Sequence, residues 1–171
     1  LVIIQLNVEQ TDVPMVFEVI NDRGVRLKPY EILKGQLLGQ IDKESLRNYE
    51  INELWEEQVN AINAYSTDWT DEVDNFFIAY LRAKFSNTVG DSRKFDKAYH
   101  RAIFSSTDLN LEHNPTEVKS FILSDFKYYT DLYLKLLKHS EEETKEYKHI
   151  YYNRLMERDS QFRLILAACI P

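Results

Sequence analysis

The chain has 171 residues, 44% of them hydrophobic and 13% aromatic, and this composition excludes an intrinsically disordered chain. The length suits one domain, or one domain with a helical appendage, and only four glycines and four prolines disfavour a turn-rich β-sandwich. The formal net charge of −7 argues against indiscriminate binding to nucleic acids, which requires a basic surface.

The N-terminal end of the sequence combines a strand pattern with a helix pattern. Residues 1–6 form a short β-rich run without clear alternation, which predicts a strand buried on both faces or at the edge of a sheet. Thr11 can cap a helix that begins at Asp12 and brings Phe17 and Ile20 to the core. We therefore predict a mainly α, multi-helix fold with one or two short N-terminal β-strands.

The stretch from Phe17 to Leu38 contains a helix end, a tight turn, a short extended segment and a second helix start. The turn is predicted at Asn21–Gly24, because Asn tolerates left-handed backbone conformations and Gly adopts them at no steric cost. Pro29 suits the first position of a helix, where its missing N–H group has no partner to lose. The second helix is predicted to begin there and to end near Gly39.

The rest of the chain shows helical periodicity almost throughout. Further helices are predicted over residues 44–64, 68–85, 91–104, 114–139, 141–151 and 161–168. The start at Asn114 is the strongest, since Asn can cap the helix, Pro115 follows at its first position and Glu117 at its third. This helix is the longest and is expected to be the spine of the C-terminal half.

The charges are unevenly distributed along these helices. Acidic side chains dominate residues 42–74 and basic ones dominate residues 82–101. Glu50, Glu53, Glu56 and Glu57 are expected to form a solvated helix face, with cation binding as the alternative. The basic segment is expected to be a solvated helix that offsets the acidic half, with phosphate contact as the alternative.

No known catalytic or metal-binding pattern appears in the sequence. The four histidines lack a zinc spacing, and there is no Gly-rich phosphate loop. The aromatic side chains recur at helical spacing, so we predict core positions before base-stacking surfaces. The single cysteine, Cys169, is expected to be a buried apolar thiol in a cytoplasmic protein. No apolar run approaches the roughly 20 residues that span a membrane, so no membrane partner is expected.

The stretch Phe17–Leu38 resembles the second motif of the GmrSD-type N-terminal domain family, prokaryotic proteins also described as domain of unknown function 262. The shared order is Phe-Glu-x-x-Asn-x-Arg-Gly-x-x-Leu, followed by a Lys and a Leu-Leu pair. The residues that match this motif are Phe17, Glu18, Asn21, Arg23, Gly24, Leu27, Lys34 and Leu38. The family is associated with nucleotide-dependent, modification-directed restriction and phage defence, and its fold is similar to that of ParB and sulfiredoxin.

The resemblance implies a division of the chain. Residues 1–40 would be the C-terminal part of a ParB-like GmrSD-type domain, and residues 41–171 its helical extension. The family's first motif, Asp-Gly-Gln-Gln-Arg, which carries the nucleotide chemistry, is absent here, and so is a His-Asn-His nuclease domain. We expect a piece of a larger protein that is inactive alone and holds no cofactor itself. In the full-length protein a nucleoside triphosphate and Mg²⁺ would be cofactors, and DNA a partner besides the missing N-terminal part of the domain.

The candidate ligand-binding residues lie in and after the predicted turn. They are Glu18, Asn21, Arg23, Gly24, Arg26 and Lys34. The Asn21 amide can hydrogen-bond a ligand, and the Arg23 guanidinium suits phosphate or carboxylate. Gly24 lets backbone N–H groups face an anion. The alternative is structural: Asn21 caps the preceding helix, and Arg23 pairs with Glu18 or Glu31.

Two function classes therefore remain open. One is part of a nucleotide-dependent DNA-defence enzyme, and the other is a non-catalytic helical interaction module. The apolar runs Leu1–Leu6 and Leu164–Leu166 lie at ends that look cut. Each is expected to leave an exposed patch or to associate with another copy.

Overall fold

The computed structural model describes residues 27–171, and this part of the chain is mainly helical, as predicted. The helices are α2 (Pro29–Leu38), α3 (Lys43–Asn48), α4 (Ile51–Asn63), α5 (Glu72–Phe85), α6 (Val89–Phe104), α7 (Pro115–Ser120), the π-helical segment η1 (Phe121–Phe126), α8 (Lys127–Glu141), α9 (Lys148–Leu155) and α10 (Ser160–Ala168). No β-strand occurs among residues 27–171. The predicted N-terminal strand and the turn at Asn21–Gly24 lie outside the described residues.

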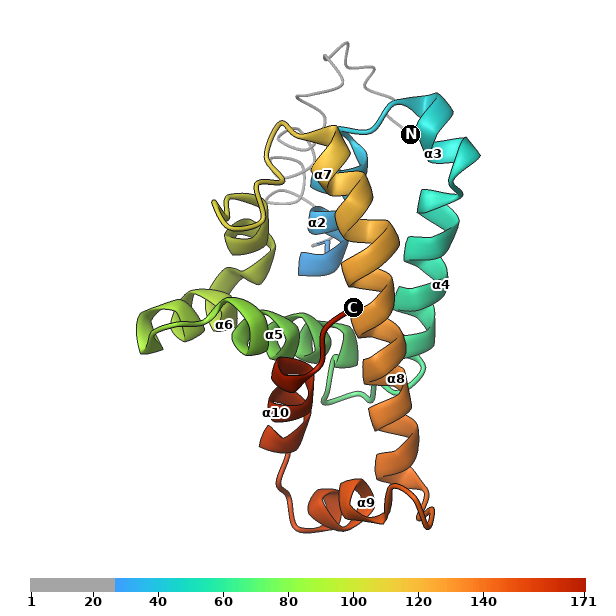
Figure 1. Ribbon diagram of the computed structural model, residues 1–171, viewed down its shortest axis with the longest axis vertical. Helices are drawn as coiled ribbons and strands as arrows, with labels where there is room; N and C mark the ends of the chain where they lie inside the picture. The colour runs from blue at the N-terminus through green and yellow to red at the C-terminus, as the bar shows by residue number, and fades with distance from the viewer. Residues whose placement is uncertain (1–26) are drawn as a thin grey trace, which may run out of the picture.

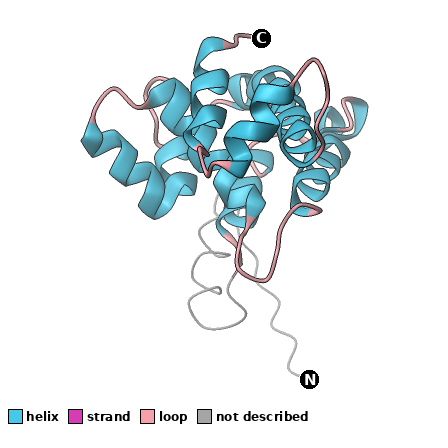
Figure 2. Ribbon diagram, turned by 90° about the horizontal axis from the view of Figure 1, so that it is seen from below, coloured by secondary structure: helices cyan, strands magenta, loops and turns pink. Residues whose placement is uncertain are grey.

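The helices pack around one long rod (Figure 1). The rod consists of α7, η1 and α8 in direct succession, and α4 packs along its side. On the other side, α5 packs against α6 and α10, and α2 packs against α6. Figure 2, turned by 90°, shows these helices and the loops that connect them without any strand in the described part. The contacts join helices from both ends of the described chain into one core.

The rod is the spine that the sequence predicts over residues 114–139. The Asn114 side chain accepts a hydrogen bond from the Glu117 N–H at 3.4 Å, and Pro115 occupies the first position of α7. The backbone stays helical through η1, a wider turn inserted in an otherwise α-helical rod. Phe121, Ile122 and Phe126 in this turn are all buried. The π-helical turn therefore presents three large apolar side chains to the core.

The predicted helix over residues 44–64 is wrong in one respect, because the chain breaks between α3 and α4. Glu50 has φ 47° and ψ 39°, a left-handed conformation that an α-helix of L-residues cannot continue through. Asp42 caps α3 by accepting the Ser45 N–H at 2.8 Å. A Glu rarely adopts the left-handed region, so no local residue signal marks this break.

The predicted start of α5 also moves, from residue 68 to Glu72. Thr67 and Thr70 exchange backbone hydrogen bonds of 2.9 and 3.2 Å, which closes a turn before the helix. The Asp71 side chain then accepts the N–H groups of Val73 and Asp74, both at 3.2 Å. Asp71 is thus the cap of α5 rather than a member of its first turn.

Two further helices, α6 and α9, begin at other residues than predicted. A capping box between Thr88 and Asp91 starts α6 at Val89, two residues before the predicted start. The α9 helix begins at Lys148 instead of residue 141, since α8 continues to Glu141 and residues 142–147 form a non-helical connection after it. The predicted final helix is confirmed as α10.

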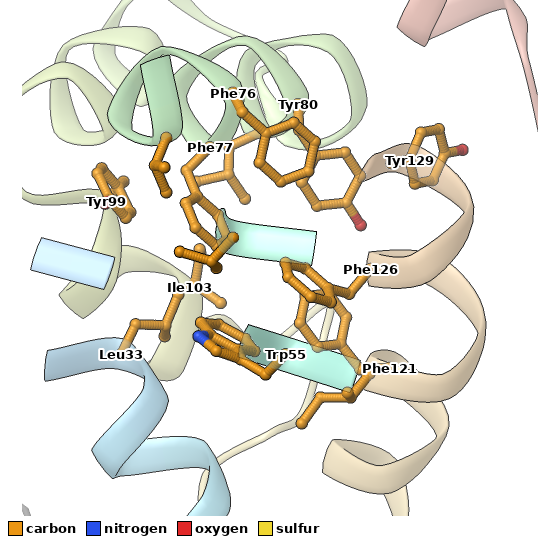
Figure 3. Close-up of a cluster of buried hydrophobic side chains, with 14 of the residues drawn as sticks. Leu33, Trp55, Phe76, Phe77, Tyr80, Tyr99, Ile103, Phe121, Phe126 and Tyr129 are labelled. Carbon is orange, nitrogen blue, oxygen red and sulfur yellow. The ribbon is translucent and has the colours of Figure 1, made fainter. Parts of the chain in front are cut away.

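Aromatic side chains form the centre of the core (Figure 3). The Trp55 and Phe126 rings stack with centroids 4.5 Å apart and planes 12° apart. Phe77 stacks on Tyr99 at 5.1 Å, and Phe76 meets Tyr133 edge to face at 5.3 Å. The prediction that the aromatic side chains serve the core is confirmed for these residues.

None of the helices in the described part of the chain is both long and apolar enough to cross a membrane.

Candidate functional site

Most of the sequence-predicted site lies just ahead of the described chain. Glu18, Asn21, Arg23, Gly24 and Arg26 lie outside the described residues, and Lys34 is the one candidate within them. What the structure adds is the helix into which the motif continues and the contacts that hold that helix.

The α2 helix is anchored by its apolar face. Leu33, Leu37 and Leu38 are buried in the main core, and Leu38 is the final residue of the motif. Figure 3 shows Leu33 reaching from α2 toward Trp55 and Ile103. Burying a leucine stabilises a fold by roughly 1.5–3 kcal/mol, so three of them fix α2 firmly. The end of the motif is therefore part of the helical body.

Lys34 of α2 is partly buried and forms an ion pair with Glu56 of α4. Both residues line a small pocket of about 130 Å³ together with Tyr30 and Asn60. Pockets for small organic ligands usually measure about 300–1,000 Å³. In the described structure Lys34 therefore joins α2 to α4.

The point where the motif enters α2 is fixed by an ion pair. The Lys28 ammonium lies 2.8 Å from Asp71 Oδ2, and this hydrogen bond is the main reason why the pKa of Lys28 is raised. Asp71 is also the cap of α5. The Lys28 N–H donates to Glu31 Oε2 at 2.6 Å, as in a helix cap. Lys28 lies four residues after the predicted turn at Asn21–Gly24, which we call the motif turn, and is thus connected to the N-termini of both α2 and α5.

A hollow of about 340 Å³ lies beside this point, and we call it the entry pocket. Lys28, Thr67, Trp69 and Asp71 contribute to its lining. Trp69 is 95% exposed, which is unusual for the largest apolar side chain. The entry pocket therefore combines the Lys28 cation, the Asp71 carboxylate and the Trp69 ring at the start of α2.

A partly buried carboxylate, that of Asp74, connects α5 to α6 nearby. The Tyr99 hydroxyl donates to Asp74 Oδ1 at 2.5 Å. Burial raises the pKa of Asp74, partly offset by the Tyr99 hydrogen bond, and burial together with Asp74 raises the pKa of Tyr99. Tyr99 is consequently a neutral donor at physiological pH, and this pair holds the helices on which α2 packs.

The remaining residues that the sequence analysis singled out are the acidic helix face, the basic segment and Cys169. The solvated acidic face is confirmed, because Glu50, Glu53, Glu56 and Glu57 are all exposed. In the basic segment Arg82 pairs with Asp96 at 3.1 Å. Cys169 is partly exposed, so the prediction of a buried thiol is wrong. Among residues 27–171, no group of three or more His, Cys, Asp or Glu side chains is arranged to hold a metal ion.

The predicted exposure of the apolar run Leu164–Leu166 is only partly confirmed. Leu164 is exposed, as expected, but Leu166 is fully buried. Leu166 is buried within the described chain, where α10 packs against both α5 and α8.

Sequence reasoning missed Lys28, Trp69 and Asp71. Asp71 carried a usable signal, because an Asp ahead of an apolar-periodic segment is a preferred helix cap. No sequence signal indicates that Lys28 pairs with Asp71, since the two residues are far apart in the chain.

Comparisons with known proteins give no further guide to this site. No family model, no curated protein and no solved structure matches the chain.

Proposed function

We propose that the chain is part of a GmrSD-like prokaryotic protein that acts in nucleotide-dependent DNA restriction or phage defence. In this proposal the described helices hold the motif turn in place, and the chain is inactive without the first motif. The observation that carries the proposal is the motif itself, whose order and spacing agree from Phe17 to Leu38.

The surroundings of α2 support this role for the helical body. Leu38 ends the motif inside the core, and Lys28 is paired with Asp71 where the chain leaves the motif turn. A binding loop is most effective when a rigid element positions it. The helical body would therefore limit the positions that the turn can adopt.

The proposal assigns roles to the candidate residues. Asn21, Arg23 and Gly24 would contact the nucleotide or DNA phosphates, with Glu18 and Arg26 beside them. Lys34 would position α2 through its pair with Glu56. The nucleoside triphosphate, Mg²⁺ and DNA belong to the full-length protein, because the first motif is missing from this sequence.

The second candidate is a non-catalytic helical interaction module. The exposed Trp69 ring favours it, since Trp is enriched at the centres of protein interfaces. In that case Trp69→Ala would abolish partner binding, and changes in the motif turn would leave it intact.

The test uses the longer protein expected to contain this chain, with nucleotide-dependent cleavage of modified DNA as the readout. Arg23→Ala should lower the activity roughly tenfold or more, the size expected for a lost charge-assisted hydrogen bond. The matched control is Arg93→Ala, which removes the same charge from an exposed position on α6. Wild-type activity in Arg23→Ala, equal losses in both variants, or no nucleotide-dependent activity in the wild type would contradict the proposal.

A further inference from the structure

A third pocket, of about 400 Å³, is lined by residues of α5, α8, α9 and α10 and by none of α2. In Figure 1, α9 connects the lower ends of α8 and α10, and α5 crosses above. The volume lies within the usual range of about 300–1,000 Å³ for small-molecule sites. We call this feature the arginine pocket, because three of its lining residues are Arg82, Arg154 and Arg163.

The three arginines come from three different helices and differ in their partners. Arg82 of α5 is paired with Asp96 at 3.1 Å, and Arg154 of α9 is paired with Asp159. Arg163 of α10 is partly buried, and no ion pair or hydrogen bond of its guanidinium occurs among the described residues. Two of the three positive charges are thus offset locally, and the third is not.

The N-terminal part of α5 adds hydrogen-bond acceptors to the lining of the arginine pocket. Glu72 is only 9% exposed, and its Oε1 accepts the Tyr133 hydroxyl at 2.5 Å. Its Oε2 accepts the Asn75 amide at 3.2 Å. A carboxylate oxygen can accept two hydrogen bonds, so Glu72 keeps capacity for a further donor. Its described hydrogen-bond partners include no cation.

An apolar wall lies between these polar groups. Ile78 and Ala79 of α5 and Phe162 of α10 line the pocket, and the Phe162 ring meets Tyr133 edge to face at 5.5 Å. Ile78, Ala79 and Arg82 recur at helical spacing after Glu72 and Asn75, so one face of α5 supplies acceptor, apolar wall and cation in turn. A ligand that matches this order carries a hydrogen-bond donor, an apolar body and an anionic group.

We infer that the arginine pocket binds a small organic oxyanion, a phosphate or a carboxylate, with an apolar body and a hydrogen-bond donor at its other end. The anionic group pairs with Arg163, and with Arg82 and Arg154 beside it, because the guanidinium fork matches both oxyanions. The apolar body lies along Ile78 and Phe162, and the donor reaches Glu72. The site uses no residue of the motif turn, so it stands independently of the proposed function.

Electrostatics favours an anion-binding pocket over a group of arginines that only face water. Asp96 and Asp159 already offset Arg82 and Arg154, so a bound anion chiefly supplies the partner that Arg163 lacks in the described structure. Three arginines line the pocket against two carboxylates, Glu72 and Asp159, which leaves one surplus positive charge there on a chain whose net charge is −7. In a site from which water is partly excluded, this surplus attracts an anion more strongly than it would in bulk water.

The test is a calorimetric titration of the chain at low salt with three probes. The probes are 4-hydroxyphenyl phosphate, 4-hydroxybenzoate and uncharged phenol. We expect saturable binding of at least one anion and none of phenol, and the stronger anion identifies the ligand class. Arg163→Gln should weaken binding about tenfold, the loss of one charge-assisted hydrogen bond.

The matched control is Arg93→Gln, which removes the same charge from an exposed position outside the pocket. Its affinity should equal that of the wild type, and both variants should melt at the wild-type temperature because neither residue is fully buried. Absence of saturable binding by both anions would overturn the inference. Equal weakening in both variants would overturn it too, because it would reveal attraction by general surface charge.

Discussion

The Tyr133 hydroxyl of α8 donates a hydrogen bond of 2.5 Å to the Glu72 carboxylate at the start of α5, and both side chains are buried. Burial and the neighbouring Glu72 charge raise the pKa of Tyr133, so the hydroxyl keeps its proton. This contact joins the rod to the helix on which both α6 and α10 pack.

Tyr133→Phe should lower the free energy of unfolding by about 1–3 kcal/mol, because it leaves a buried carboxylate without one of its donors. Urea denaturation measures the change. Tyr152→Phe is the control, since it removes an exposed hydroxyl that donates to Glu143 at 2.9 Å. Equal losses in the two variants would show that the Glu72 contact contributes no more than a surface hydrogen bond.

Trp55→Ala should destabilise the protein by about 3–5 kcal/mol, the usual cost of removing a large aromatic core side chain. The Trp55 ring is 1% exposed and stacks on Phe126. Trp69→Ala should change stability by no more than about 0.5 kcal/mol, because the side chain is almost fully exposed. Urea denaturation followed by far-UV circular dichroism measures both changes. A large loss for Trp69→Ala would contradict the described exposure.

The pH dependence of stability should differ between two aspartates. Burial, the largest influence, raises the pKa of Asp74, and the nearby Asp71 adds to this effect while Lys28 opposes it. The folded state then holds the proton more tightly than the unfolded state, so the Asp74 carboxyl favours folding progressively more as pH falls toward its unfolded pKa. Relative to Asp74→Asn, which keeps an acceptor for Tyr99, the wild type should therefore gain stability as pH is lowered from 7 to 4.

The contribution of Asp42 to stability should change with pH in the opposite direction to that of Asp74. The Ser45 N–H group holds the pKa of Asp42 below its usual value, so its contribution is complete above the unfolded pKa and is lost as pH falls through the folded one. Relative to Asp42→Asn, the wild type should lose stability as the solution becomes acidic. Thermal melts across the pH range test both aspartates, and the same sign for both would contradict the assigned causes.

The chain alone should hydrolyse no nucleoside triphosphate, because the motif that carries nucleotide chemistry in the resembling family is missing here. Phosphate release above a buffer control is the measurement. Turnover that disappears in Asn21→Ala would show that the chain is catalytically complete.

Local chemistry explains which parts of the fold were predictable. Pro29 and the Asn114-Pro115 pair determine helix starts through their own backbone and side chains, and both predicted starts agree with the structure. The break at Glu50 has no such local signal. The pairs Lys28–Asp71 and Glu72–Tyr133 join positions distant in sequence, so periodicity could not reveal them. Of the candidate site, Lys34 forms an ion pair with Glu56, and a ligand-binding role for it and for the other five residues stays a prediction.

If the motif turn is a binding site held by the described helices, a nucleotide should bind to it, and equilibrium binding measures this. The quantity is the affinity of a fluorescent ATP analogue for the longer protein expected to contain this chain, in wild type, Arg23→Ala and Arg93→Ala. We expect saturable binding that Arg23→Ala weakens roughly tenfold or more at an unchanged melting temperature, while Arg93→Ala binds like the wild type. Equal affinity in all three proteins, or no saturable binding in the wild type, would contradict it.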